Sequence, residues 1–124
     1  MKQAILVFIG GGFGSVARYF IGKILNNSTS GIPYGTLVAN VLGSLFIGII
    51  LGLAIKNNTF SQNQTLLLAT GFCGGFTTFS TFAYENVGLL KSGDFLNFFI
   101  YTIVTFVIGL GAVFSGLYLT KTVF

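Results

Sequence analysis

Several residue types that carry enzyme and metal chemistry are scarce or missing from this sequence. The 124 residues include no histidine, no tryptophan, one cysteine, one proline and only two acidic residues. Clusters of His and Cys that hold zinc, and cysteine–histidine nucleophiles, are therefore excluded. Two carboxylates also leave little material for paired acid/base catalysis. We expect a protein that is not an enzyme.

Charge is also scarce, while apolar residues are abundant. Charged residues make up 6% of the chain and hydrophobic residues 53%, and the mean hydropathy is +0.90. A chain this apolar cannot cover itself with a polar surface, so it belongs in a lipid bilayer. We expect an integral membrane protein with no nucleic-acid partner.

The length suits four spans, because a helix needs roughly 20 residues to cross the hydrocarbon core. The apolar runs and their polar boundaries predict an all-α membrane protein, one four-helix transmembrane domain over residues 1–124. The connections are short, so neighbouring helices should be antiparallel and both termini should lie on one side. The predicted helices cover about residues 4–25, 33–55, 65–90 and 95–120.

The third span contains a segment that should not stay helical. Residues 71–82 place glycines and hydroxyl side chains where a span is normally apolar throughout. An unpaired backbone group is costly in hydrocarbon, so such a segment survives only where an ion, water or another polar group satisfies it. We therefore predict a helix broken near its middle, at residues 74–78, and an ion-related role for the break.

Polar residues inside the spans are the candidate functional residues, because lipid makes them expensive. Those of the second span recur every four residues and form one face. This face either joins helices or contacts an ion, since an amide donates hydrogen bonds to an anion as readily as to another helix. The polar and aromatic candidates in the spans are Thr36, Asn40 and Ser44, then Phe79, Phe82 and Glu85, then Tyr101 and Thr105.

Positive charges are almost balanced between the two ends of the predicted helices. Lys2, Lys56 and Lys121 fall on the side of the termini, whereas Lys23 and Lys91 fall on the other side and Arg18 lies deeper. The positive-inside rule therefore specifies orientation only weakly. Two interpretations stay open: insertion in both orientations as an antiparallel pair, or a single topology.

Three motifs together resemble one family, the Fluc (CrcB) fluoride ion channels. They occur in three of the four helices, in the order that the family has, and in a chain of the right length. The motifs are Gly11-Gly12-Phe13-Gly14-Ser15-Val16-Ala17-Arg18-Tyr19, Gly35-Thr36-Leu37-Val38-Ala39-Asn40, and Gly71-Phe72-Cys73-Gly74-Gly75-Phe76-Thr77-Thr78-Phe79-Ser80-Thr81-Phe82.

The resemblance implies a dual-topology homodimer in the prokaryotic cytoplasmic (inner) membrane, which exports fluoride passively through two pores. Asn40 would contact fluoride, and Phe79 and Phe82 would line the pore with their ring edges. Backbone carbonyls of Gly74 and Thr77 would hold a structural sodium ion, and Arg18 would be structural or electrostatic. The remaining pore residues would be Ser80, Thr81, Glu85, Tyr101 and Thr105.

Two other functions fit a small four-helix membrane protein. A small multidrug-type, proton-coupled exporter would use Glu85 as its carboxylate, although the usual glutamate of such exporters lies in the first span, where this chain has none. A non-transporting tetraspan subunit would use its polar face only to bind partner helices.

Overall fold

The computed structural model describes residues 1–26, 31–57 and 60–122, and these contain helices but no strand. The first two spans are α1 (Lys2–Leu25) and α2 (Tyr34–Asn57). The last is α6 (Phe95–Thr122). The third is built from four pieces: α3 (Gln62–Thr65), the π-helix η1 (Leu66–Cys73), α4 (Gly74–Phe76) and α5 (Ser80–Lys91).

The described residues therefore form four helical spans, each long and apolar enough to cross a membrane. Their ends lie within a few residues of the predicted positions. Pro33 precedes α2 instead of starting it, and its carbonyl accepts a hydrogen bond from the Leu37 amide at 3.1 Å.

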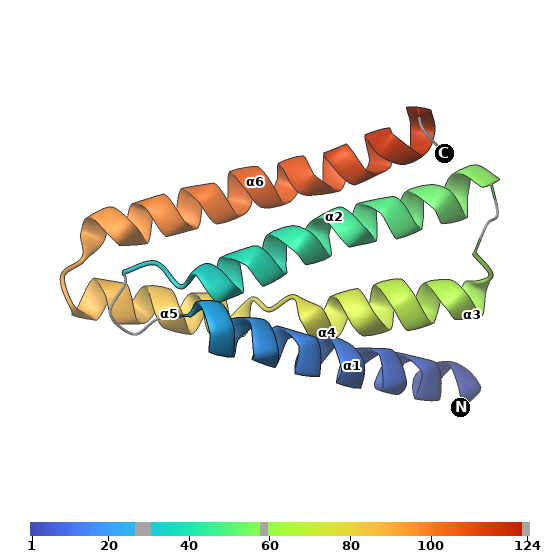
Figure 1. Ribbon diagram of the computed structural model, residues 1–124, viewed down its shortest axis with the longest axis horizontal. Coiled ribbons are helices and arrows are strands. Elements are labelled where there is room, and N and C mark those ends of the chain that lie inside the picture. Colours follow the sequence, from blue (N-terminus) through green and yellow to red (C-terminus); the bar gives the residue numbers. More distant parts are fainter. Residues whose placement is uncertain (27–30, 58–59, 123–124) are drawn as a thin grey trace.

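Consecutive spans run in opposite directions, so the start of α1 and the end of α6 lie at the same end of the bundle (Figure 1). Consequently α1 runs parallel to the third span, and α2 runs parallel to α6. Lys2, Lys56 and Lys121 lie at or next to the helix ends on this side, and Lys23 and Lys91 close the helices at the other. The predicted balance of lysines thus holds in the fold.

Glycines allow the parallel helices to touch through their backbones. A Cβ added to Gly10 would overlap the carbonyl oxygen of Leu67, and one added to Gly14 would overlap that of Phe72. Gly48 of α2 lies equally close to α6, where an added Cβ would come within 3.2 Å of the Gly116 Cα. Small residues that let backbones approach are the usual means of packing helices in lipid.

The break in the third span is real, but the predicted position, residues 74–78, is wrong at its start. Gly74–Phe76 is helical, and the chain becomes extended only at Thr77, with φ −89° and ψ 159°. Helix resumes at Ser80. The glycines were misread because Gly75 serves packing: a Cβ there would overlap the carbonyl oxygen of Gly11. The break therefore spans Thr77 to Phe79.

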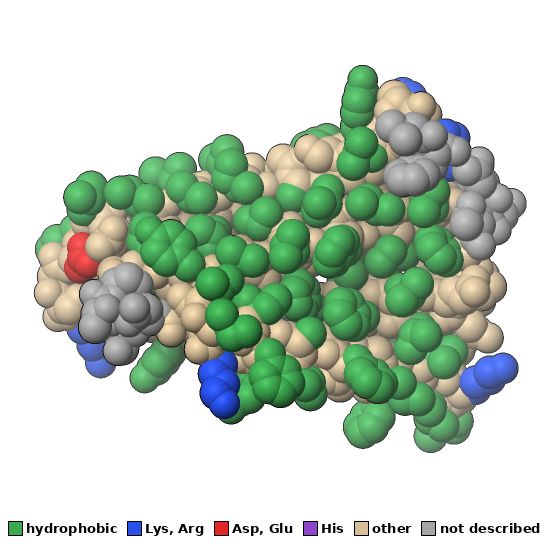
Figure 2. Space-filling view, in the orientation of Figure 1, with side chains coloured by type: hydrophobic (Ala, Val, Ile, Leu, Met, Phe, Trp, Pro, Cys, Tyr) green, Lys and Arg blue, Asp and Glu red, His purple; other side chains and the backbone are tan. Residues whose placement is uncertain are grey.

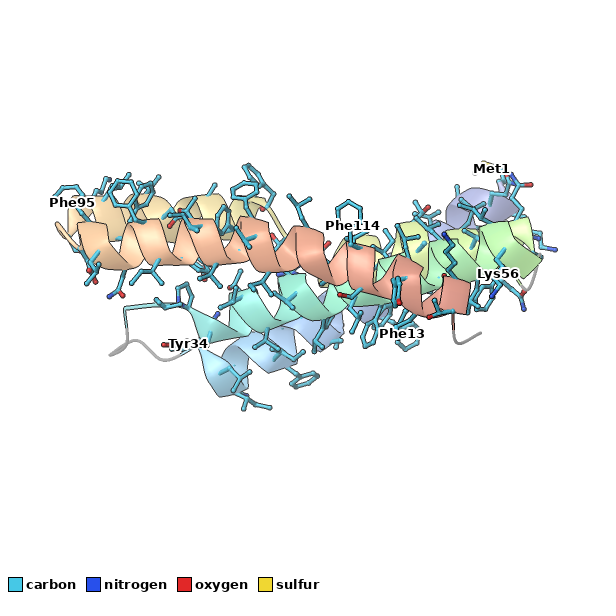
Figure 3. All side chains as sticks on the ribbon, turned by 90° about the horizontal axis from the view of Figure 1, so that it is seen from above. Met1, Phe13, Tyr34, Lys56, Phe95 and Phe114 are labelled. Atoms are coloured by element: carbon cyan, nitrogen blue, oxygen red, sulfur yellow. The ribbon has the colours of Figure 1, made fainter. Side chains whose placement is uncertain are left out.

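Most apolar side chains point away from the bundle. Hydrophobic atoms cover the face seen in Figure 2, and side chains project outward along the helices in Figure 3. Only 6% of the most apolar stretch of α6 is buried within the chain. Because exposed apolar area of this extent is unfavourable in water, these faces contact lipid or another protein surface.

Two alanine substitutions on α1 test the glycine contact. Gly14→Ala should lower the thermal unfolding midpoint in detergent by about 5 °C or more, because overpacking costs about 1–3 kcal/mol. Gly12→Ala is the matched control, since no atom lies within 4 Å of its added Cβ. Equal midpoints for the two variants would contradict the backbone contact between α1 and η1.

Candidate functional site

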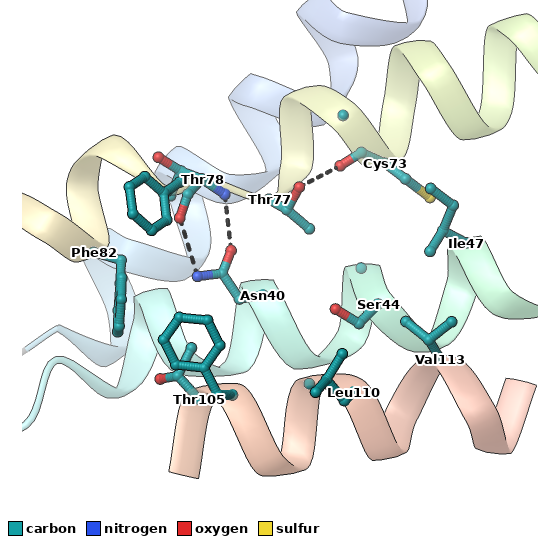
Figure 4. Close-up of a pocket in the computed structure, with 15 residues that line it drawn as sticks. Asn40, Ser44, Ile47, Cys73, Thr77, Thr78, Phe82, Thr105, Leu110 and Val113 are labelled. Carbon is teal, nitrogen blue, oxygen red and sulfur yellow. Dashed lines mark hydrogen bonds between the residues drawn. The ribbon is translucent and has the colours of Figure 1, made fainter. Parts of the chain in front are cut away.

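Asn40 of α2 holds the break in place. Its Nδ2 donates to the Thr78 carbonyl oxygen at 3.1 Å, and the Thr78 amide donates back to Oδ1 at 2.8 Å (Figure 4). This two-point contact satisfies both backbone groups of Thr78 at mid-span, where unpaired groups are costly. Asn40 therefore joins two helices, and its Nδ2 retains one further N–H for another acceptor.

A second contact satisfies the end of α4. The Gly75 carbonyl oxygen accepts from Arg18 Nε at 3.1 Å and from Ser15 Oγ at 3.4 Å. Carbonyls in the last turn of a helix have no intrahelical partner. Arg18 thus bonds to the last turn of the helix before the break, and its charge lies close to the break.

The neighbouring carbonyls of Gly74 and Thr77 have no hydrogen-bond donor within the described residues. The Thr77 hydroxyl is turned to the Cys73 carbonyl, to which it donates at 2.9 Å. No cluster of three His, Cys, Asp or Glu residues occurs in the described ranges. Free carbonyl oxygens are hard ligands of the kind that a monovalent cation such as sodium accepts, so this donor set fits the implied ion.

A cavity of about 520 Å³ opens at the break. Asn40, Thr78 and Thr105 lie at one end of the close-up in Figure 4, and apolar Ile47 and Val113 at the other. It brings together six of the residues that the sequence predicted for the pore and the ion: Asn40, Gly74, Thr77, Phe79, Phe82 and Thr105.

The two phenylalanines differ in their surroundings. Phe79 is 71% exposed, whereas Phe82 is 5% exposed, and their ring centroids lie 5.9 Å apart. Phe82 also meets Tyr101 edge to face at 5.0 Å and Phe106 at 6.0 Å. Phe82 is therefore buried between the rings of Tyr101 and Phe106, while most of the Phe79 ring is exposed and available to lipid or to another protein surface.

A smaller cavity of about 340 Å³ lies on the other side of Thr78, which lines both. Arg18 and Lys23 make it basic, and Thr81 reaches it from α5. The Thr78 hydroxyl caps α5 by accepting from the Thr81 amide at 3.2 Å. Ser80 is exposed, lines neither cavity, and lies 3.4 Å from the Thr78 hydroxyl.

Glu85 and Tyr101 stand apart from both cavities and bond to one another. Tyr101 donates to Glu85 Oε1 at 2.8 Å, and the Thr36 hydroxyl donates to Oε2 at 2.9 Å. The carboxylate is thereby held by two hydroxyls from two different helices, α2 and α6.

Sequence reasoning missed one residue of this network, Asn26. Its Oδ1 accepts from the amides of Gly35 and Thr36 at 2.7 and 3.2 Å, and its Nδ2 donates to the Thr36 hydroxyl at 3.3 Å. Asn26 thus satisfies the start of α2 and orients Thr36. The sequence does show that Asn26 ends an apolar run a few residues before Pro33. A polar residue at such a position is also typical of an ordinary turn, so it does not indicate a role in the network.

The fold and this site define a multi-pass membrane protein with a polar break in its third span. Residues 5–117 match the family described as "CrcB-like protein, Camphor Resistance (CrcB)". The chain is 48% identical to the fluoride-specific ion channel FluC of Gloeothece citriformis, over 98% of both chains. It is 46% identical to the FluC of Chlorobaculum tepidum, over 98% of this chain and 96% of that one.

The chain therefore belongs to the CrcB family, as its motifs predicted. It is a multi-pass protein of the bacterial cell membrane and not an enzyme. The family that matches this chain is not one of multidrug-type exporters or of assembly subunits.

Proposed function

We propose that this protein is a fluoride-selective channel that lets fluoride leave the cytoplasm passively. One observation carries the proposal: hydrogen-bond donors and an aromatic cluster meet at a mid-span break that opens into a cavity. Relatives that align over nearly the whole chain are named fluoride-specific ion channels, which supports the choice of ion.

The chemistry of fluoride explains why these groups suit it. Fluoride is small and strongly hydrated, so it enters a region of low dielectric only where donors replace its water. The second N–H of Asn40 and the Thr105 hydroxyl are such donors. Phe82 and Phe79 present rings whose edges carry partial positive charge, and a ring edge attracts an anion where no water is present.

The basic cavity provides a route of approach. Arg18 and Lys23 attract anions from solution. Thr78 lines both cavities. An ion in the basic cavity would therefore pass Thr78 to reach Asn40 in the larger cavity. Ser80, Thr81, Glu85 and Tyr101 would extend the polar track on the α5 side.

We further propose that two copies assemble as an antiparallel homodimer with two pores. Two exposed residues at the break, Phe79 and Gly74, support this, because the single chain leaves both of them open to contact with a second copy. The balance of lysines at the two ends supports insertion in both orientations.

A sodium ion at the centre of the dimer is the final part of the proposal. The carbonyls of Gly74 and Thr77 would hold it, two from each copy. When bound, the ion supplies positive potential near both pores.

The channel function is tested with purified protein in liposomes, by fluoride efflux after a potassium ionophore is added and without a proton gradient. We expect the wild-type protein to release fluoride and little chloride.

Phe82→Ile keeps apolar bulk but removes the ring edge, so fluoride efflux should fall by about tenfold or more, as expected for a loss of about 1.5 kcal/mol or more. Phe114→Ile, a 72% exposed phenylalanine on α6, is the control. Wild-type rates in Phe82→Ile would refute the pore assignment.

Dual topology is tested with two oppositely biased variants. Lys23→Gln with Lys91→Gln leaves all three remaining lysines at the end that holds the termini, and Lys2→Gln with Lys121→Gln leaves two of three at the opposite end. Each variant alone should insert one way and lose fluoride resistance in cells, and co-expression of both should restore it. Activity of either variant alone at the wild-type level would contradict the antiparallel dimer.

The ion site is tested at Gly74. The nearest atom to a Cβ added there lies 4.0 Å away, so the chain itself tolerates a side chain. Gly74→Val should nevertheless convert the dimer to monomer on gel filtration in sodium buffer, because it crowds the carbonyls that would hold the ion. Gly111→Val, at a position with nothing within 4 Å, is the control. A stable dimer of Gly74→Val would count against the central ion.

A further inference from the structure

Gly43 is a buried glycine of α2 that faces the start of the break. A Cβ added at this position would overlap the methyl group of Thr77, and it would lie 3.2 Å from a ring atom of Phe76. Gly10 and Gly14 let two backbones approach, whereas Gly43 leaves room for side chains of another span. The first of these side chains belongs to the residue at which the third span becomes extended.

The side chain of Thr77 is held on two sides. Its hydroxyl donates to the Cys73 carbonyl oxygen at 2.9 Å (Figure 4), and its amide donates to the same oxygen at 3.0 Å. Its methyl group lies against Gly43. Because threonine has few staggered orientations about χ1, a hydroxyl directed at Cys73 and a methyl group directed at Gly43 together fix its rotamer.

The peptide group between Thr77 and Thr78 is held from α2 at both of its ends. The Thr78 amide donates to Asn40 Oδ1 at 2.8 Å. Asn40 and Gly43 are three residues apart, so they lie on one face of α2. This peptide is trans, and the C=O and N–H of a planar trans peptide point in opposite directions. The Thr77 carbonyl therefore points away from Asn40.

We propose that Gly43 is a positioning residue of the break. By leaving room for the Thr77 methyl group, it fixes the residue at which the third span leaves its helix and the direction of the Thr77 carbonyl. The inference rests on the proposed channel function and deepens it, because Asn40 and Gly43 then support the two sides of one peptide group. A side chain at position 43 displaces Thr77, and with it the Thr78 amide that Asn40 binds.

A second effect of a side chain at position 43 has to be separated from this one. Gly43 also lines the larger cavity, so an added methyl group narrows that cavity. Thr77→Ser distinguishes the two effects, because it removes the methyl group that the new Cβ would meet and keeps the hydroxyl that binds Cys73. In the double variant the added methyl group still narrows the cavity, but it no longer displaces Thr77.

The experiment is a double-mutant cycle, measured by fluoride efflux from liposomes and by thermal unfolding. Gly43→Ala should lose about tenfold or more of the efflux and unfold at a lower temperature, because the contact with Thr77 is overpacked. Thr77→Ser should lose about threefold, since its hydroxyl bond remains but the place of its methyl group is empty. Gly43→Ala with Thr77→Ser should return to about the efflux of Thr77→Ser, because the new methyl group takes the place of the lost one.

Gly52→Ala is the matched control on the same helix. Its added Cβ would overlap the hydroxyl of Thr120 on α6, so it also meets a threonine side chain. Neither Gly52 nor Thr120 lines either of the two cavities. This variant should unfold at a lower temperature and keep its efflux.

Three outcomes would overturn the proposal. One is wild-type efflux in Gly43→Ala, and another is an equal loss of efflux in Gly52→Ala. The third is a double variant with no more efflux than Gly43→Ala, which would assign the loss to the narrowed cavity. The channel function itself fails only if the wild-type protein shows no fluoride efflux, and the unfolding temperatures of the cycle then still test the contact between Gly43 and Thr77.

Discussion

The fold depends on how the backbone of the broken span is satisfied inside the membrane. Side chains from other helices satisfy it: Asn40 binds both backbone groups of Thr78, and Arg18 and Ser15 donate to the carbonyl of Gly75. Without Asn40, both backbone groups of Thr78 would lie unpaired in hydrocarbon, at a cost of several kcal/mol each. The hydrogen bonds that hold the neighbouring helices against the break therefore also determine the shape of the cavity.

This constraint also explains where the glycines stand. Arg18 and Ser15 reach Gly75 only because α1 lies against the third span at backbone distance, and the close contact of Gly75 with Gly11 permits that approach. The widened π-helix before the break lies against Gly10 and Gly14 in the same seam. One line of small residues thus brings α1 near enough to complete the hydrogen bonds of another helix.

Much of this could be predicted from the sequence, because hydropathy fixes the spans and an expensive polar residue in lipid has to be used. Asn40 and Thr105 were found in this way and Phe82 through its place in the family motif, and the three do meet at one cavity. The start of the break was misplaced because glycine signals both bending and close packing, and only the neighbouring helix distinguishes them. Asn26 was missed because its partners, Gly35 and Thr36, become neighbours only after α1 and α2 fold back on one another.

The polar groups of the chain differ in whether they have a hydrogen-bond partner and in whether another molecule can reach them. Both backbone groups of Thr78 have a partner, whereas the carbonyl oxygens of Gly74 and Thr77 lack a donor within the described residues and the ring of Phe79 is exposed. In the interior, Asn86 Oδ1 and Thr102 Oγ1 are also without a hydrogen-bond partner among the described residues, but these atoms are buried. A group from outside the chain can therefore reach the carbonyls at the break, whereas the interior atoms stay enclosed by the chain's own helices.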